Sequence, residues 1–158
     1  MATYRATIEW TLKDGEHFAN GRYSRGHTVA FAELDAFTAA ETGPEMKPFV
    51  DGLAKAKGEL QEATMWLMQN GLANPDNAGA ASTDYLHLFG LTALAYMWSL
   101  QAKAALARIA GGDKDPFYET KLVIGRYYIE RVLPETSGHL AKLKTGSDLL
   151  MKLPAEAF

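Results

Sequence analysis

Three proline residues constrain the fold more than any other feature, because each follows a residue that caps helices well. The pairs are Gly43-Pro44, Asn74-Pro75 and Asp115-Pro116. Proline suits the first helical position, where its missing amide costs nothing and its fixed φ matches the helix. Gly71 and the Gly111-Gly112 pair stand where helices should stop. We therefore expect helices over residues 32–42, 44–71, 74–111 and 115–145, the last with a bend near Pro134.

Apolar residues recur at three- and four-residue steps in the three longer helices, which predicts one buried stripe along each. In the second helix the stripe is Met46, Phe49, Leu53, Ala56, Leu60, Ala63 and Leu67. In the third it is Leu86, Phe89, Ala93, Tyr96, Leu100 and Ala104. In the fourth it is Tyr118, Leu122, Gly125, Ile129 and Val132. Such stripes bury against one another, so the predicted fold is mainly α, an antiparallel helical bundle of about four helices.

In the first 31 residues the apolar positions repeat with a different period, close to that of a β-strand. Alternating apolar and polar residues over 3–12 indicate a half-buried strand, and a second, less regular alternation ends at Phe31. Two pairs of good turn formers lie between these stretches, Asp14-Gly15 and Asn20-Gly21. We therefore predict an N-terminal β-hairpin over residues 1–31, followed by the helical bundle over residues 32–158.

The predicted hairpin needs something to cover its apolar face, because an isolated two-stranded hairpin is at best marginal in water. It can lie on the bundle or pair with the same hairpin of a second chain, and edge pairing of identical strands gives a twofold dimer. We expect a homodimer. Its possible interface consists of Ile8, Trp10, Leu12, Tyr23, Val29 and Phe31.

Composition excludes several classes of chemistry. The chain has no cysteine, which removes disulfides, thiolate catalysis, iron–sulfur clusters and cysteine zinc sites. The net charge of −3 is spread along 158 residues, so neither a nucleic-acid groove nor a polybasic membrane patch is indicated. No apolar run approaches the ~20 residues of a membrane span, and the first residues lack a signal-peptide pattern. We expect a single cytoplasmic domain.

No catalytic, cofactor-binding or metal-binding residue is predicted. The four histidines, including His87, lack metal-ligand spacing, and no phosphate-binding glycine motif occurs. Asp113 and Asp115 are better explained by helix capping at Asp115 than by a calcium loop, which needs further oxygen ligands. Arg126 and Glu130 are spaced for a surface ion pair. The aromatic run YLHLFGLTALAYMWSL is typical of a helical core, with a ligand pocket as the alternative.

Two long stretches carry a resemblance to a known family. They are LQEATMWLMQNGLANPDNAGAASTDYLHLFGLTALAYMWSLQAKAAL and GGDKDPFYETKLVIGRYYIERVLPE. Through them, residues 32–158 resemble the C-terminal helical domain of bacterial acyl-CoA dehydrogenases. That family uses FAD and a catalytic carboxylate to oxidise acyl-CoA thioesters, and both belong to upstream regions that nothing here matches. The resemblance implies a non-catalytic accessory or oligomerisation domain without a cofactor of its own, which packs on a dehydrogenase body or on a neighbouring subunit. The alternative is a helical bundle that binds an acyl or CoA ligand.

The N-terminal stretch carries a second resemblance. ATIEWTLKDGEHF and GRYSRGHTVAF are similar to the opening hairpin of OsmC-type hydroperoxide reductases. That family reduces peroxides with two cysteines and an activating arginine, whose place Arg22 or Arg25 would take. Without cysteine the arginine has nothing to activate, so we expect no peroxidase activity. The two resemblances meet near Phe31, which predicts a chimera or fusion.

Overall fold

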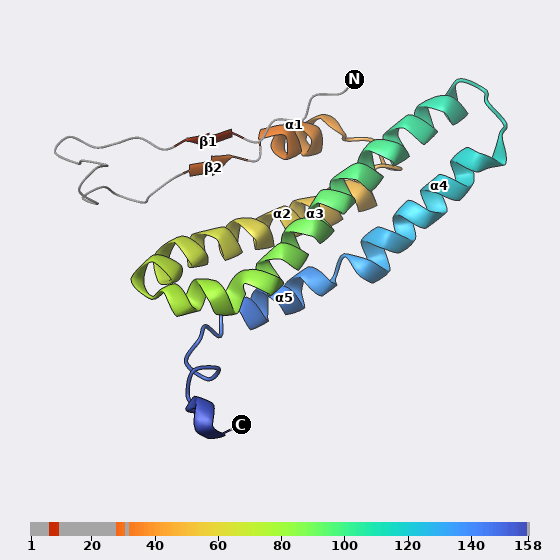
Figure 1. The fold of residues 1–158 in the computed structure, drawn as a ribbon. Coiled ribbons are helices and arrows are strands. Elements are labelled where there is room, and N and C mark those ends of the chain that lie inside the picture. The colour runs from red at the N-terminus through yellow and green to blue at the C-terminus, as the bar shows by residue number, and fades with distance from the viewer. Residues whose placement is uncertain (1–6, 10–27, 31, 158) are drawn as a thin grey trace.

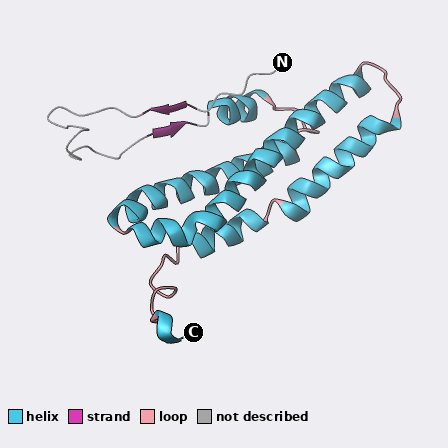
Figure 2. Cartoon of the chain, in the orientation of Figure 1, coloured by secondary structure: helices cyan, strands magenta, loops and turns pink. Residues whose placement is uncertain are grey.

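The computed structural model describes residues 7–9, 28–30 and 32–157, and this part of the chain is mainly helical (Figures 1 and 2). The α-helices are α1 (Ala32–Ala40), α2 (Lys47–Trp66), α3 (Pro75–Ala110), α4 (Pro116–Tyr127) and α5 (Glu135–Leu143). Two π-helices and one 3-10 turn complete the helical elements, η2 (Leu67–Gly71), η3 (Tyr128–Val132) and η4 (Ala155–Ala157).

Two short strands precede the helices. β1 (Thr7–Glu9) pairs antiparallel with β2 (Thr28–Ala30), and Ile8 is the register partner of Val29. The turns expected at Asp14-Gly15 and Asn20-Gly21 lie outside the described residues. The hairpin over residues 1–31 therefore stays a prediction.

Helix α3 is the axis of the bundle. At 1.5 Å per residue its 36 residues span about 54 Å. α2 packs antiparallel to it, α4 returns beside its C-terminal half, and α5 lies against its N-terminal half (Figure 1). α1 contacts the bundle through Phe37, whose ring meets Tyr96 edge-on at a centroid distance of 5.5 Å. The antiparallel helical bundle predicted from sequence is confirmed.

Two of the three proline pairs start helices as predicted. The Asn74 side chain accepts a hydrogen bond from the Asp76 amide at 3.1 Å, and the Asp115 side chain accepts one from the Phe117 amide at 2.9 Å. The prediction for Gly43-Pro44 is wrong by three residues, since α2 begins at Lys47. Residues 44–46 form a turn instead, closed by a hydrogen bond from the Met46 amide to the Gly43 carbonyl at 3.0 Å.

The helix expected over residues 115–145 is divided near Pro134, where the sequence predicts a bend. Proline has no amide hydrogen and its ring collides with the carbonyl four residues earlier, so a regular α-helix cannot pass through it. The chain widens into η3 just before this residue, and the Leu133 amide bonds to the Tyr128 carbonyl five residues back at 2.9 Å. α5 then starts at Glu135.

The core consists of two clusters along α3. The first joins α1, α2, the C-terminal half of α3 and the η3 region, and the second joins the end of α2, the first half of α3 and α5. The stripe predicted for the second helix is confirmed from Met46 to Ala63, where all six residues are buried. In the fourth helix, Gly125 and Ile129 are buried and the other stripe residues are half-buried.

The stripe predicted for the third helix is only partly correct, because Tyr96 and Leu100 are half-buried against the first core cluster but the other four residues are exposed. Leu86 is 69% exposed, Phe89 is 47% exposed, and Ala93 and Ala104 are also exposed. The buried face of α3 consists of Ala81, Leu88, Thr92, Ala95, Ser99, Ala102 and Ala105. Except for Leu88 these residues are small, because α3 is surrounded by α2, α4 and α5 and its neighbours approach closely. Four large apolar residues of α3 are exposed to solvent instead, namely Leu86, Phe89, Leu94 and Met97.

Close approach between α2 and the η3 region depends on Gly52. A Cβ atom at this position would lie 2.6 Å from Cγ2 of Ile129, a β-branched and therefore stiff side chain. A Cβ at Gly125 on α4 would lie 2.9 Å from the Phe49 ring. These two glycines allow the backbones to approach.

We expect Gly52→Ala to destabilise the fold and Gly58→Ala, in the same helix, to stabilise it. Crowding of Ile129 costs roughly 1–3 kcal/mol, which exceeds the roughly 0.5–1 kcal/mol that alanine gains over glycine inside a helix. A Cβ atom at Gly58 would meet no neighbouring atom within 4 Å, so only the gain applies there. Urea denaturation of both variants measures this difference. Equal midpoints would contradict the assigned helix contact.

Tyr128 provides a pH-dependent contribution to stability. Its hydroxyl donates to the Leu91 carbonyl at 3.0 Å, and burial, helped by the charge of Glu135, raises the pKa of Tyr128 to about 12 from 10.0. The unfolded chain therefore releases this proton at lower pH than the folded chain. We expect Tyr128 to lower stability progressively as the pH rises from 10 to 12 and to have no such effect below pH 10.

The measurement is the unfolding free energy of wild type and Tyr128→Phe across that pH range. The unfolding free energy of Tyr128→Phe should fall less with rising pH than that of wild type. Tyr127→Phe, at an exposed neighbouring residue, should show the same fall as wild type. If the unfolding free energies of wild type and Tyr128→Phe fall in parallel with pH, Tyr128 is not the group responsible for this pH dependence.

Candidate functional site

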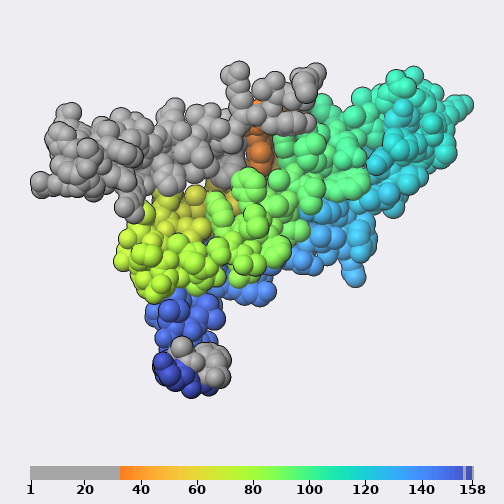
Figure 3. Space-filling model, in the orientation of Figure 1, coloured from red at the N-terminus to blue at the C-terminus, as the bar shows by residue number. Residues whose placement is uncertain are grey.

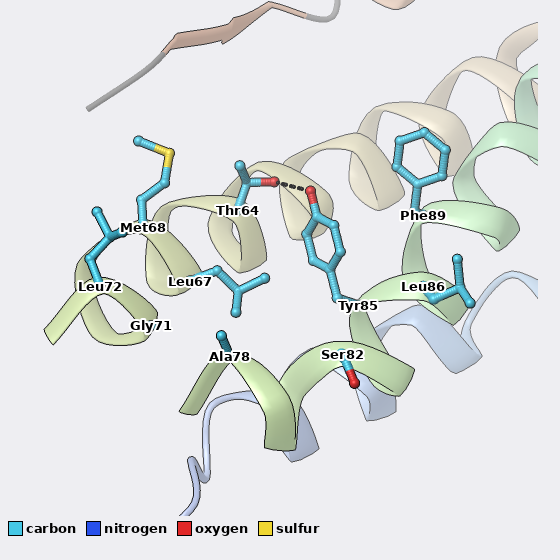
Figure 4. A pocket seen from close by; sticks show the side chains of 10 residues that line it. All are labelled: Thr64, Leu67, Met68, Gly71, Leu72, Ala78, Ser82, Tyr85, Leu86 and Phe89. Carbon is cyan, nitrogen blue, oxygen red and sulfur yellow. Dashed lines mark hydrogen bonds between the residues drawn. The ribbon is translucent and has the colours of Figure 1, made fainter. Parts of the chain in front are cut away.

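An apolar groove lies between the end of α2 with η2 and the first half of α3 (Figure 4). It encloses about 630 Å³, a volume within the range of small-molecule sites. Its lining residues are Thr64, Leu67, Met68, Gly71, Leu72, Ala78, Ser82, Tyr85, Leu86 and Phe89. We refer to this feature as the apolar groove.

The closed end of the groove forms where the two helices meet. A Cβ atom at Gly71 would lie 3.2 Å from Cβ of Ala78, so small residues at both positions let the chain turn tightly from η2 into α3. Figure 4 shows Leu67 pointing between the helices towards Tyr85, whereas Met68 and Leu72 stand along the rim. The rim residues Leu72, Leu86 and Phe89 are exposed to solvent.

Polar groups in the groove are already hydrogen-bonded. Thr64 donates its hydroxyl hydrogen to the Leu60 carbonyl at 2.8 Å. The contact of 2.9 Å between Thr64 Oγ1 and the Tyr85 hydroxyl is therefore donated by Tyr85. Ser82 bonds to the Gly79 carbonyl of its own helix at 2.8 Å. No lining residue is charged, so the groove suits an apolar group and offers no ionic anchor for a phosphate.

A polar cluster connects α3 and α5 beside the groove helices. His139 Nδ1 lies 2.7 Å from Asp84 Oδ1, and the His139 ring stacks on His87 at a centroid distance of 5.0 Å. Among the described residues, no three histidine or acidic side chains gather as metal ligands. The interpretation of His87 as a surface or helix-interface residue is confirmed. Sequence reasoning misses both the stacking of His87 on His139 and the contact of His139 with Asp84, which joins residues 55 positions apart.

A second polar cluster joins α2 to α5. Ser137 donates to Glu59 Oε1 at 2.6 Å, and Lys55 Nζ lies 3.0 Å from the Ser137 hydroxyl. The other carboxylate oxygen, Glu59 Oε2, is buried with no hydrogen-bond partner among the described residues. The serine bonds directly to a carboxylate rather than to a histidine, so this cluster lacks the nucleophile–base–orienter arrangement of hydrolases.

The two acidic positions near the α3–α4 loop have structural roles. Asp115 caps α4, as predicted, and Asp113 Oδ1 accepts the Asp115 amide at 3.1 Å. Asp113 also pairs with Arg108 at 3.0 Å. The predicted surface pair of Arg126 and Glu130 is confirmed, with Arg126 Nε 2.6 Å from Glu130 Oε1.

Most residues of the predicted dimer interface fall outside the described residues, namely Trp10, Leu12, Tyr23 and Phe31. Ile8 and Val29 are described only as paired backbone positions in β1 and β2. Arg22 and Arg25 also lie outside the described part. The interface, the hairpin resemblance and the chimera therefore stay predictions.

The sequence indicates only half of the groove. The aromatic run that begins at Tyr85 suggests one pocket wall, whereas sequence reasoning misses the facing wall on η2. A usable signal exists there, because Met68 and Leu72 are four residues apart and continue beyond the stripe that ends at Leu67. Apolar residues outside a stripe are the pattern that an additional apolar surface produces.

Comparison with family models identifies a relationship to known proteins. A family model described as acetyl-CoA dehydrogenase C-terminal like matches residues 30–154. No curated protein matches the chain significantly. In the described part of the chain, no helix has both the length and the apolar content needed to cross a membrane.

Proposed function

Because the chain belongs to the acetyl-CoA dehydrogenase C-terminal-like family, we propose that it is a non-catalytic accessory domain that functions by packing against another protein surface. The partner is a second copy of the chain in a homodimer, or the body of an acyl-CoA dehydrogenase. In this proposal the chain carries no FAD and no catalytic base of its own. Its contribution is assembly.

The main support for this proposal is the outward face of α3. Leu86, Phe89, Leu94 and Met97 are all large, apolar and exposed, and they follow one another along a single helix. Soluble monomers usually place such residues inwards and polar residues outwards. Here the inward positions hold small residues, so the large ones are available for a partner. Exposed apolar surface of this kind marks protein interaction sites.

The groove chemistry supports a packing role. Its lining has no carboxylate, and its hydroxyl groups are bonded to the bundle itself. Tyr85 carries a titratable hydroxyl in this lining, and that hydroxyl contacts Thr64 Oγ1 at 2.9 Å. The groove therefore offers mainly apolar contact.

We expect Met97→Glu to weaken self-association of the purified chain, because it places a charge in the centre of the apolar α3 face. Sedimentation equilibrium across protein concentrations should show a dimer for wild type and a dissociation constant raised about tenfold or more for the variant. Thr120→Glu adds the same charge at an exposed position of α4 and should leave association unchanged. If wild type is a dimer and Met97→Glu does not weaken it, the outward face of α3 is not part of the interface.

A second candidate function is the binding of an acyl chain, which the volume and apolar lining of the groove favour. Titration calorimetry with dodecanoate, CoA and dodecanoyl-CoA separates the possibilities. We expect dodecanoate and dodecanoyl-CoA to bind alike and CoA not to bind, since no charged residue lines the groove. Equal binding of CoA and dodecanoyl-CoA would indicate a nucleotide site elsewhere and contradict this candidate.

A further inference from the structure

The segment over residues 147–153, here termed the leucine segment, exposes four large apolar side chains. Leu149 is 78% exposed and Leu150 is 66% exposed, and Met151 and Leu153 are also exposed. Isolated exposed apolar residues are common on protein surfaces, but four within five positions are not. The bundle that precedes the segment provides no cover for these side chains.

The leucine segment contains a single helical turn. The Met151 amide bonds to the Ser147 carbonyl four residues back at 2.9 Å, which closes this turn. Leu149, Leu150 and Met151 are consecutive on it, and all three are exposed to solvent. The segment therefore presents its apolar side chains outward, where a groove could take them up.

The start of the segment is fixed to the bundle. Ser147 is buried, and its amide and hydroxyl both donate to Asn77 Oδ1, each at 2.9 Å. Beyond this anchor the chain leaves the bundle and extends away from it (Figure 1). In the space-filling view the segment projects as a separate protrusion below the bundle (Figure 3).

The anchor also lies beside the apolar groove. Asn77 precedes Ala78, which lines the groove, so the segment departs one residue along α3 from that wall. The chain runs away from the bundle at this anchor, and the apolar side chains of the segment stay exposed instead of covering the groove of their own chain (Figures 1 and 3). A second copy can bring its own segment to this open groove.

We propose that the leucine segment of one copy docks in the apolar groove of a second copy and that the second copy reciprocates. This proposal rests on the proposed function and specifies its partner. The groove has an apolar rim and no charged lining residue, and the segment offers an apolar face of matching character. Reciprocal exchange covers both surfaces at once and closes as a twofold dimer.

Cross-linking tests the contact directly, because the chain has no cysteine of its own. One preparation carries Leu150→Cys and the other carries Met68→Cys at the groove rim, and the two are mixed and treated with a short bis-maleimide. We expect a heterodimeric cross-linked product at several-fold higher yield than in a mixture with Lys114→Cys. Lys114 is exposed in the loop between α3 and α4, beyond the end of α3 remote from the groove.

Two outcomes of the cross-linking would overturn the exchange. One is equal yield with Met68→Cys and Lys114→Cys. The other is an internal cross-link, independent of protein concentration, in a single chain that carries both Met68→Cys and Leu150→Cys, since this would show that each chain fills its own groove.

A matched pair of charge variants separates this proposal from the proposed function. Leu150→Asp should raise the dimer dissociation constant about tenfold or more, whereas Val123→Asp, at a 69% exposed residue of α4, should leave it within a factor of about three. If wild type dimerises and Leu150→Asp does not weaken the dimer, segment exchange is wrong while an assembly role stands. If wild type stays monomeric at all concentrations, self-association and exchange both fail.

Discussion

The close contact between the small-residue face of α3 and its neighbours determines the rest of the structure. Ala81, Ala95 and Ala102 are almost completely buried, so the surrounding helices approach the α3 backbone rather than its side chains. Gly52 and Gly125 extend the same principle to the contacts of α2 with η3 and α4. Interiors pack densely, and small residues at facing positions let helix backbones come together without voids. One long helix can therefore contact three others along its length.

This inner face has a direct consequence for the outer one. A face that neighbouring helices approach closely has little room for large residues, and several large apolar residues of α3, such as Leu86 and Met97, are exposed to solvent. The same applies where α2 runs into η2, since Gly71 and Ala78 bring the helices together and leave Leu72 and Phe89 at the rim of the groove. The exposed apolar surface thus arises from the way the core is packed.

Local chemistry in the sequence predicts much of the fold, but it does not predict the long-range contacts. Asn74 and Asp115 cap helices by accepting hydrogen bonds from amides two residues away, so their role can be predicted from the adjacent residues in the sequence. The α2 stripe can be predicted equally well because most of its large apolar residues share one buried face. In α3, Leu86 and Phe89 give the stronger pattern while Ala95 and Ser99 form the real core, and hydrophobicity alone ranks these positions in the reverse order. The groove forms where the outward side of α3 meets η2. Predicting its η2 wall therefore requires knowing which face of α3 is buried, and the hydrophobic pattern of α3 does not show this.

Three buried hydroxyl groups in the core are hydrogen-bonded within their own helices. Thr64, Thr92 and Ser99 are buried, and each hydroxyl donates at 2.8 Å to the carbonyl four residues earlier in its own helix. These hydroxyls have the small volume that close helix contact requires, and the back-bonding removes the cost of an unpaired buried polar group. These three hydroxyl groups are therefore satisfied within one chain, whereas apolar side chains on the outer face of α3 and in the leucine segment are exposed to solvent. A domain built in this way can hold its shape before it meets a partner, which is the property that a preorganised docking surface requires.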